Sequence, residues 1–279
     1  MASSTCALPV TLPIRTKRVV STGEKGNIGS SRGRIIRLAT VFHPQNDRLS
    51  PEAHFPVSRV QRASGPRLVN RFNRCEMMLV IAGSCLRNGG YAPVGGCAFV
   101  FGGGDDDDDD DDDAGRDRDE SRKTDGHAVG VGAVAFRLES RDADPPSSPE
   151  DTCNRAKLSA AIAALRIRDW AGEGWRRVVV VTDLEYLAKG ATEWLPNWVR
   201  SNWRKPPGAK PGKKGGRDDE RRCYLNRDLW EELQARIEEL MAAGCEVSFW
   251  QVNGEEYDRN DQGVLARAKR AAQTAMRGS

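Results

Sequence analysis

Residues 178–186 read Val-Val-Val-Val-Thr-Asp-Leu-Glu-Tyr, an apolar run that is followed directly by a carboxylate. Four consecutive valines with no polar side chain between them predict a central strand that is buried on both faces. A strand of this kind needs packed layers on both sides of its sheet. The segments before and after it must therefore supply further strands and covering helices.

The segments before this strand predict one helix and three strands. An alanine-rich helix is expected at about 154–170, with Thr152 or Asn154 as its cap and Gly172 after its end. Three earlier apolar segments are expected to be strands, the second and third of them paired: 77–82, 96–101 and 129–138.

The segments after the strand are mainly helical. Short helical pieces are expected at 184–199, an amphipathic helix at 227–243, a strand at 246–252 and a last helix to about residue 276. The resulting order, βββαβααβα, predicts an α/β fold in which helices pack on a mixed five-stranded sheet.

Charge is segregated along the chain. Residues 1–75 carry thirteen Lys and Arg against three acids, and their short apolar clusters keep no period. We expect a disordered basic tail there, with a mitochondrial transit peptide as the open alternative. The folded domain is expected at 77–275. It is interrupted at 102–127 by a charged insertion with nine consecutive aspartates, which we expect to be solvated.

Cysteine usage and hydropathy bear on location. The seven cysteines form no CxxC pair and have no histidine at zinc-ligand spacing, so we expect reduced thiols. No apolar run approaches the roughly 20 residues that span a bilayer. We expect an intracellular protein with no membrane partner, and leave a mitochondrial or a nuclear location open.

Four strings in this element order are more specific than the order itself. They are Gly83-Ser84-Cys85-Leu86-Arg87-Asn88-Gly89, Asn154-Arg155-Ala156-Lys157-Leu158, Thr182-Asp183-Leu184-Glu185-Tyr186 and Asn226-Arg227-Asp228-Leu229-Trp230. With the spacing of Trp194, Trp198 and Trp203, they make the chain from about 77 to 275 resemble type 1 ribonuclease H, of the RNase H-like superfamily. The matches are collinear over about 200 residues.

The resemblance implies a site in which four carboxylates clamp two divalent metals about 3.5 to 4 Å apart and cleave the RNA strand of an RNA–DNA hybrid. Here only Asp183 is retained. Ala82, Lys157 and Gly263 stand at the other three positions. An ammonium near a cation costs about 4 kcal/mol per unit charge pair at 4 Å and an effective dielectric near 20. We therefore expect neither a bound metal nor another cofactor, where active members hold two magnesium ions.

Three details of this site follow from the same resemblance. A change of register would let Asp258 or Asp261 replace the fourth carboxylate, and this alternative stays open. Glu255 stands where active members carry a loop histidine. Lys157 is expected to form an ion pair with Asp183, with a lysine that reaches past the site into water as the alternative.

Binding residues are also implied by the resemblance. The loop 204–222 carries eight Lys and Arg against three acids, and in the family this loop contacts phosphates. The candidates for nucleic-acid contact are Asn88, Thr152, Asn154, Trp198, Trp203, Lys205, Lys210, Lys213 and Lys214. In the alternative, the tryptophans anchor the core or the loop and the basic residues are merely solvated.

These expectations favour a type 1 RNase H-like protein that binds a nucleic acid duplex, either an RNA–DNA hybrid or double-stranded RNA, and does not cleave it. Two alternatives are kept. One is an active hybrid endoribonuclease, and the other is a protein-interaction module, with a protein partner, that retains only the fold.

Overall fold

The computed structural model describes residues 16–18, 35–61, 63–86, 94–103, 132–138, 149–205 and 224–277. Most of the acidic insertion and of the basic loop lies outside these ranges. At the centre is a six-stranded mixed sheet with the strand order β3-β10-β9-β6-β7-β8. Its strands are β3 (Thr40–Val41), β6 (Glu76–Leu86), β7 (Val94–Val100), β8 (Ala133–Arg137), β9 (Arg177–Thr182) and β10 (Glu246–Gln251).

The valine-rich strand β9 lies between β6 and β10 and runs parallel to both. Val178 to Val181 are fully buried, as expected for a strand covered on both faces. Strand β6 continues past β9 into an antiparallel pairing with β7, which brings Ala82 opposite Ala98. The ends of β6 and β9 therefore lie side by side, and the placement of Ala82 and Asp183 follows from this register.

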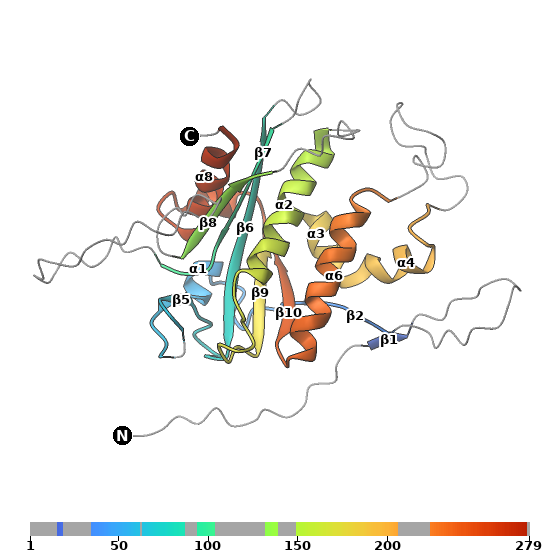
Figure 1. The fold of residues 1–279 in the computed structure, drawn as a ribbon. Helices are drawn as coiled ribbons and strands as arrows, with labels where there is room; N and C mark the ends of the chain where they lie inside the picture. Colours follow the sequence, from blue (N-terminus) through green and yellow to red (C-terminus); the bar gives the residue numbers. More distant parts are fainter. Residues whose placement is uncertain are drawn as a thin grey trace, which may run out of the picture.

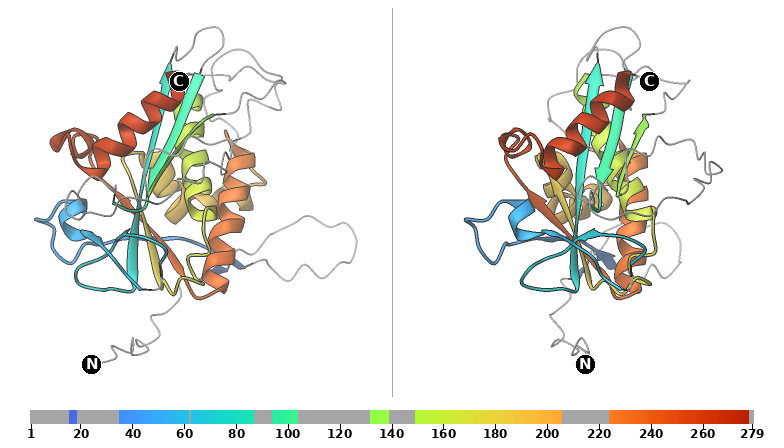
Figure 2. Two further views of the ribbon diagram at one scale, coloured as in Figure 1. Left: turned by 60° about the vertical axis from the view of Figure 1, so that its left-hand side comes forward. Right: turned by 90° about the vertical axis from the view of Figure 1, so that its left-hand side faces the viewer.

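The helices form two layers on the sheet (Figures 1 and 2). Helix α2 packs on β6 and β7 and α6 on β10, whereas α8 packs on β6, β7 and β8 from the other face. The helices are α1 (Pro51–His54), α2 (Pro149–Arg166), α3 (Glu185–Lys189), the π-helical turn η2 (Gly190–Trp194), α4 (Leu195–Arg200), α6 (Arg227–Ala242), α7 (Glu256–Arg259) and α8 (Val264–Arg277). The predicted α/β class and element order are confirmed.

Successive side chains of β6 pack alternately against the two helix layers. Leu79 and Ile81 pack on the side of α2, and Val80 and Ala82 pack on the side of α8. Side chains of successive strand residues point to opposite faces, so the two core clusters have the period of two that a doubly covered strand requires.

Two expectations are wrong, one about where a helix begins and one about the number of strands. Helix α2 begins at Pro149, so Thr152 and Asn154 lie inside its first turns and do not cap it. The sheet has six strands and not five, because β3 pairs in parallel with β10 through Thr40 and Ser248. This edge strand is two residues long and has no hydrophobic period of its own.

The expectation of a disordered tail through residue 75 is also wrong for its second half. Residues 35–61 and 63–75 fold onto the sheet as β2 (Ile35–Arg37), β3, α1, β4 (Val57–Ser58) and β5 (Arg67–Leu68), and β1 (Thr16–Arg18) pairs with β2. Phe42, Phe55 and Leu68 from this segment are buried against Val80 and Val181. Each apolar cluster of this segment is too short to form a core of its own. Together the clusters extend the part of the hydrophobic core that contains Val80 and Val181.

Candidate degenerate carboxylate site

The expected ion pair at the end of the central strand is present. Lys157 Nζ, from α2, donates to Oδ1 of Asp183 at 2.6 Å, and the two side chains are 16% and 29% exposed. Gly83 lets the helix approach this closely, because a Cβ on residue 83 would lie 2.8 Å from Cγ and 3.0 Å from the backbone nitrogen of Lys157. The carboxylate of Asp183 is therefore neutralised by an ammonium from the neighbouring helix.

Ala82 is buried on the other face of β6, where Tyr257 packs in the same cluster. The Tyr257 hydroxyl donates to the carbonyl of Ile81 at 2.9 Å and also lies 3.4 Å from that of Val181. Burial, and next the negative charge of Asp183, raise the pKa of Tyr257 well above its usual value. A neutral phenol thus joins the ends of β6 and β9, next to Ala82 and Asp183.

Gly263 lies directly before α8, and a carboxylate from the N-terminal segment takes up the space beside it. A Cβ on residue 263 would be 2.1 Å from Oε1 of Glu52. This oxygen accepts from the backbone N–H of Leu265 at 3.2 Å, and Oε2 accepts from Asn260 Nδ2 at 3.2 Å. Glu52 therefore caps α8 from another part of the chain.

Neither aspartate that was left open as a replacement joins Asp183. Asp258 is 64% exposed and pairs with Lys269, and Asp261 is 90% exposed and pairs with Arg270. The loop between β10 and α7 does approach the site, since a Cβ on Gly254 would be 3.9 Å from Oδ2 of Asp183. Glu255, the next residue, is exposed.

The residues at this site do not fit two divalent cations. A two-metal centre needs a cluster of carboxylates to offset the repulsion between the ions. Here one carboxylate is bound to an ammonium, and Glu52 is engaged by backbone and amide donors. In the part of the chain that the structure describes, no group of three or more His, Cys, Asp or Glu is placed to hold a metal.

The candidate contacts to nucleic acid are only partly described. Asn154 and Lys205 are half-buried, and Arg204 beside Lys205 is exposed. Thr152 lies in α2, within the stretch whose side chains are not described. The remaining candidates lie outside the described residues: Asn88, Lys210, Lys213 and Lys214.

Trp198 and Trp203 are buried, with 6% and 4% of their surface exposed. The Trp198 ring centroid lies 5.1 Å from those of Tyr224 and Trp230, and 6.1 Å from that of Trp203. These aromatic contacts hold the two ends of the basic loop together. They favour the anchoring role, which the sequence leaves as an alternative, over direct contact with nucleic acid.

The Asn226-Arg227-Asp228 string has a structural role that its sequence did not reveal. Arg155, at the start of α2, donates to both oxygens of Asp228 at 3.2 and 3.0 Å and to Oδ1 of Asn226 at 3.0 Å. Asn226 has a left-handed backbone with φ of 58°. The string thus ties the start of α6 to α2 beside Lys157.

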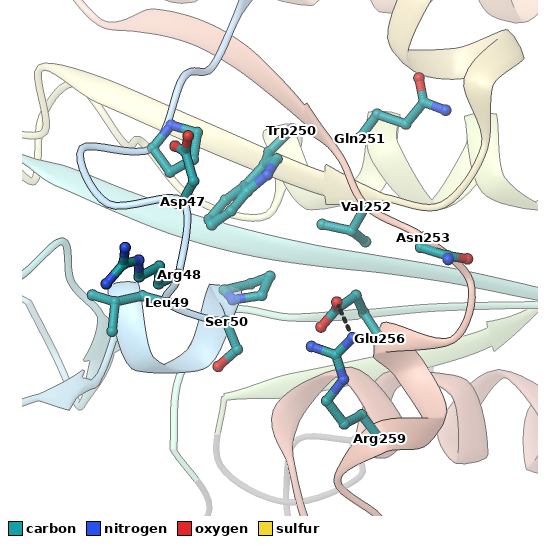
Figure 3. A pocket seen from close by; sticks show the side chains of 12 residues that line it. Asp47, Arg48, Leu49, Ser50, Trp250, Gln251, Val252, Asn253, Glu256 and Arg259 are labelled. Carbon is teal, nitrogen blue, oxygen red and sulfur yellow. Dashed lines mark ion pairs between the residues drawn. The ribbon is translucent and has the colours of Figure 1, made fainter.

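A pocket of about 220 Å³ lies where the N-terminal segment meets β10 and α7 (Figure 3). Arg48 and Ser50 line one side, and Trp250, Asn253 and Arg259 line the other. The guanidinium of Arg259 is already paired with Glu256 at 2.6 Å. The pocket therefore lies at the junction between the N-terminal segment (residues 35–75) and the sheet. The charge of Arg259 in its lining is compensated by Glu256.

The sequence patterns did not indicate the roles of Glu52 and Tyr257 or the burial of His54, because each of these residues acts through partners that are distant in the sequence.

Four described cysteines, Cys85, Cys97, Cys153 and Cys245, are reduced, whereas Cys75 is disulfide-bonded. The expectation that all cysteines are free thiols is therefore wrong for Cys75. None of the described helices is both long and apolar enough to cross a bilayer.

Comparisons with known proteins find relatives of one family. The RNase H family model matches residues 119–254. A ribonuclease H from Pelobacter propionicus is 32% identical over 133 residues, which are 48% of this chain and 68% of that protein. One from Xanthomonas oryzae pv. oryzae is 36% identical over 124 residues, 44% of this chain and 68% of that protein.

Solved structures with a similar fold include LC9-RNase H1, a type 1 RNase H with the type 2 active-site motif. It is 22% identical, and the match covers 72% of each chain with a TM-score of 0.41. RNase H1 from Halobacterium salinarum NRC-1 is 15% identical over 73% of this chain and 99% of that one, with a TM-score of 0.36. On the strength of the two sequence relatives above, this chain belongs to the ribonuclease H family.

Proposed function

We propose that this protein binds a nucleic acid duplex, either an RNA–DNA hybrid or double-stranded RNA, without cleaving it. The observation that carries the proposal is the ion pair between Lys157 and Asp183, in which an ammonium takes the place where the family mechanism needs a cation held by carboxylates. Family membership supports the binding half of the proposal, and the site chemistry supports the absence of cleavage.

Loss of cleavage follows from charge. Expelling Lys157 from Asp183 would cost the ion pair and leave a half-buried carboxylate that attracts one cation at most. Ala82 and Gly263 have no side-chain oxygen to offer a metal, and Glu52 is engaged as the cap of α8. A water nucleophile would therefore lack the metal pair that activates it in the family mechanism.

Duplex binding rests on the basic loop 204–222 and on the edge formed by α2. Eight Lys and Arg against three acids on one loop favour phosphate contacts, which give salt-dependent affinity without sequence reading. The aromatic contacts of Trp198 hold the ends of this loop on the same face of the sheet as α2. Asn154 on α2 offers a half-buried amide as a further contact.

The test is a binding titration at several salt concentrations with a labelled hybrid and with double-stranded RNA. Replacing Lys205, Lys210, Lys213 and Lys214 by Gln should weaken binding and flatten the slope of log affinity against log salt, which on B-form DNA changes by up to about 0.9 for each phosphate that is no longer neutralised. The control removes the same charge from the α8 side, at Arg259, Lys269, Arg270 and Arg277, and should change affinity far less.

Equal reductions in affinity for the two variants would mean that net charge alone, and not the loop, attracts the duplex. Unchanged affinity in the loop variant would exclude the loop as the contact surface. Failure of the parent protein to bind either duplex at low salt would contradict the proposed function and leave the protein-interaction alternative.

A further inference from the structure

Two cysteines from distant parts of the chain meet at the end of β6. Cys85 lies on β6 and Cys153 in the first turns of α2, and both are half-buried and reduced. Their thiols share a hydrogen bond. Neither has a role in the carboxylate site, although Lys157 lies close enough for its charge to act on Cys85.

The register of strand and helix brings the pair together independently of that bond. Gly83 abuts α2 at Ala156 and Lys157, since a Cβ there would lie 3.1 Å from Ala156 Cβ. Cys85 is two residues along β6 and so points to the same face, whereas Ser84 points to α8 and contacts Met276. Cys153 is one helical turn before Lys157 on α2.

We propose that Cys85 and Cys153 are a disulfide-forming pair that locks the end of β6 to the first turns of α2 when the protein meets a disulfide oxidant such as oxidised glutathione. The strand end and the helix start are each held by the sheet and by Gly83. Formation of the disulfide therefore requires the two sulfurs to bond by rotation of their side chains, with the backbone held in place by this packing.

The reaction balances with one glutathione disulfide. The Cys85 thiolate attacks one sulfur of the oxidant, which forms a mixed disulfide and releases a first glutathione thiolate. The Cys153 thiolate then attacks the Cys85 sulfur and releases the second. The two cysteines lose two electrons, the oxidant gains them, and the two protons end on glutathione.

The surroundings predict how fast this exchange runs. The hydrogen bond to Cys153, then burial, and then the nearby sulfurs of Cys153 and Cys97 raise the pKa of the Cys85 thiol, and Lys157 opposes them. Little thiolate is present at neutral pH, so the reaction is slow. Its rate should rise on the order of tenfold per pH unit between about pH 7 and 9.

Cys153 stands between Thr152 and Asn154, at the edge proposed to contact the duplex. A disulfide between Cys85 and Cys153 would fix that edge, and this consequence rests on the proposed function. The formation of the disulfide does not rest on the proposed function, and its test uses no nucleic acid.

The test is to incubate the folded full-length protein with oxidised glutathione, alkylate the remaining thiols and map the linked peptides by mass spectrometry. We expect two fewer alkylated thiols than in the untreated protein, and one new linked peptide that joins Cys85 to Cys153. Closing a loop of 67 residues between them should raise Tm by about 5–10 °C, reversibly on reduction.

Cys85→Ser and Cys153→Ser should each abolish the new peptide and the Tm increase. Cys245→Ser, which removes a buried thiol elsewhere, and Cys75→Ser, which removes the cysteine already in a disulfide, should leave both intact. Full alkylation of Cys85 and Cys153 after oxidant treatment would overturn the proposal, and so would a peptide that joins Cys85 to Cys97. The peptide map is made on the parent protein, so it tests the proposed disulfide even if a variant fails to fold.

Discussion

Lys157 Nζ lies 2.6 Å from Oδ1 of Asp183, so the carboxylate at the end of β9 is bound by an ammonium from α2. Both side chains are mostly shielded from water, which makes the contact stronger than a surface ion pair. The charge of this aspartate is therefore compensated within the fold.

Lys157→Met should lower the free energy of unfolding by about 1–2 kcal/mol, because it leaves Asp183 half-buried without its partner. The matched control is Lys189→Met, which breaks a helical ion pair with Glu185 whose side chains are 43% and 55% exposed, and it should cost less than Lys157→Met because water screens the pair. Urea unfolding of both variants measures the difference. Equal effects would mean that the Lys157 pair is no stronger than a surface contact.

Glu52→Ala should destabilise the protein by about 1 kcal/mol, because it removes the carboxylate that accepts from the Leu265 N–H at the start of α8. Glu255→Ala, at an exposed position directly before α7, is the control and should stay within about 0.5 kcal/mol of the parent. Hydrogen exchange at the first turn of α8 would locate the destabilisation. Unchanged exchange there in Glu52→Ala would show that the cap is not formed in solution.

His54, in the N-terminal segment (residues 35–75), makes the stability of the protein depend on pH. Its ring packs between Phe55, Phe72 and Trp250, with Nε2 2.6 Å from Gln45 Oε1 and Nδ1 buried without a described partner. Burial, and next the charge of Arg71, lower its pKa below the ordinary 6.5.

The unfolded chain therefore takes up a proton at higher pH than the folded chain. The contribution of His54 is present above about pH 6.5 and is lost as pH falls toward its folded-state pKa, by at most about 1.4 kcal/mol per pH unit. His54→Phe keeps a ring in the cluster and removes the titration. The urea midpoint of the parent should fall more between pH 7 and pH 5 than that of the variant, and parallel pH profiles would refute the role of His54.

The sequence predicted the elements whose apolar pattern is long and the site residues that are neighbours in a motif. The valines of β9, the helix α6 and the Lys157–Asp183 pair are of this kind. These features depend on local periodicity or on a known strand-to-helix geometry. They could therefore be predicted without knowledge of the tertiary packing.

The remaining features depend on contacts between segments that no local pattern records. Glu52 meets Gly263 across 211 positions of sequence, and Phe42 joins a core that its own segment does not form. Tyr257 is buried although its helix α7 spans only four residues. Each side chain is placed by the packing of the whole fold, so its role is visible only in three dimensions.

Restoring the family carboxylates should require a change outside the motif. Ala82→Asp, Lys157→Glu and Gly263→Asp together return the four-carboxylate set, but a side chain at residue 263 meets the Glu52 carboxylate. We expect metal-dependent cleavage of a hybrid to appear only when Glu52→Ala is added to the triple variant, because the new aspartate then has room. Any single change should remain inactive. Cleavage by the triple variant at the same rate with and without Glu52→Ala would contradict the blocking role of Glu52.

The most direct measurement is a single-turnover cleavage assay of a labelled RNA–DNA hybrid with magnesium or manganese, run beside a binding titration of the same hybrid. We predict salt-dependent binding and no metal-dependent product at enzyme excess. Product that requires the metal and disappears in Asp183→Asn would contradict this, since it would mean that Asp183 can release Lys157 and hold a catalytic cation.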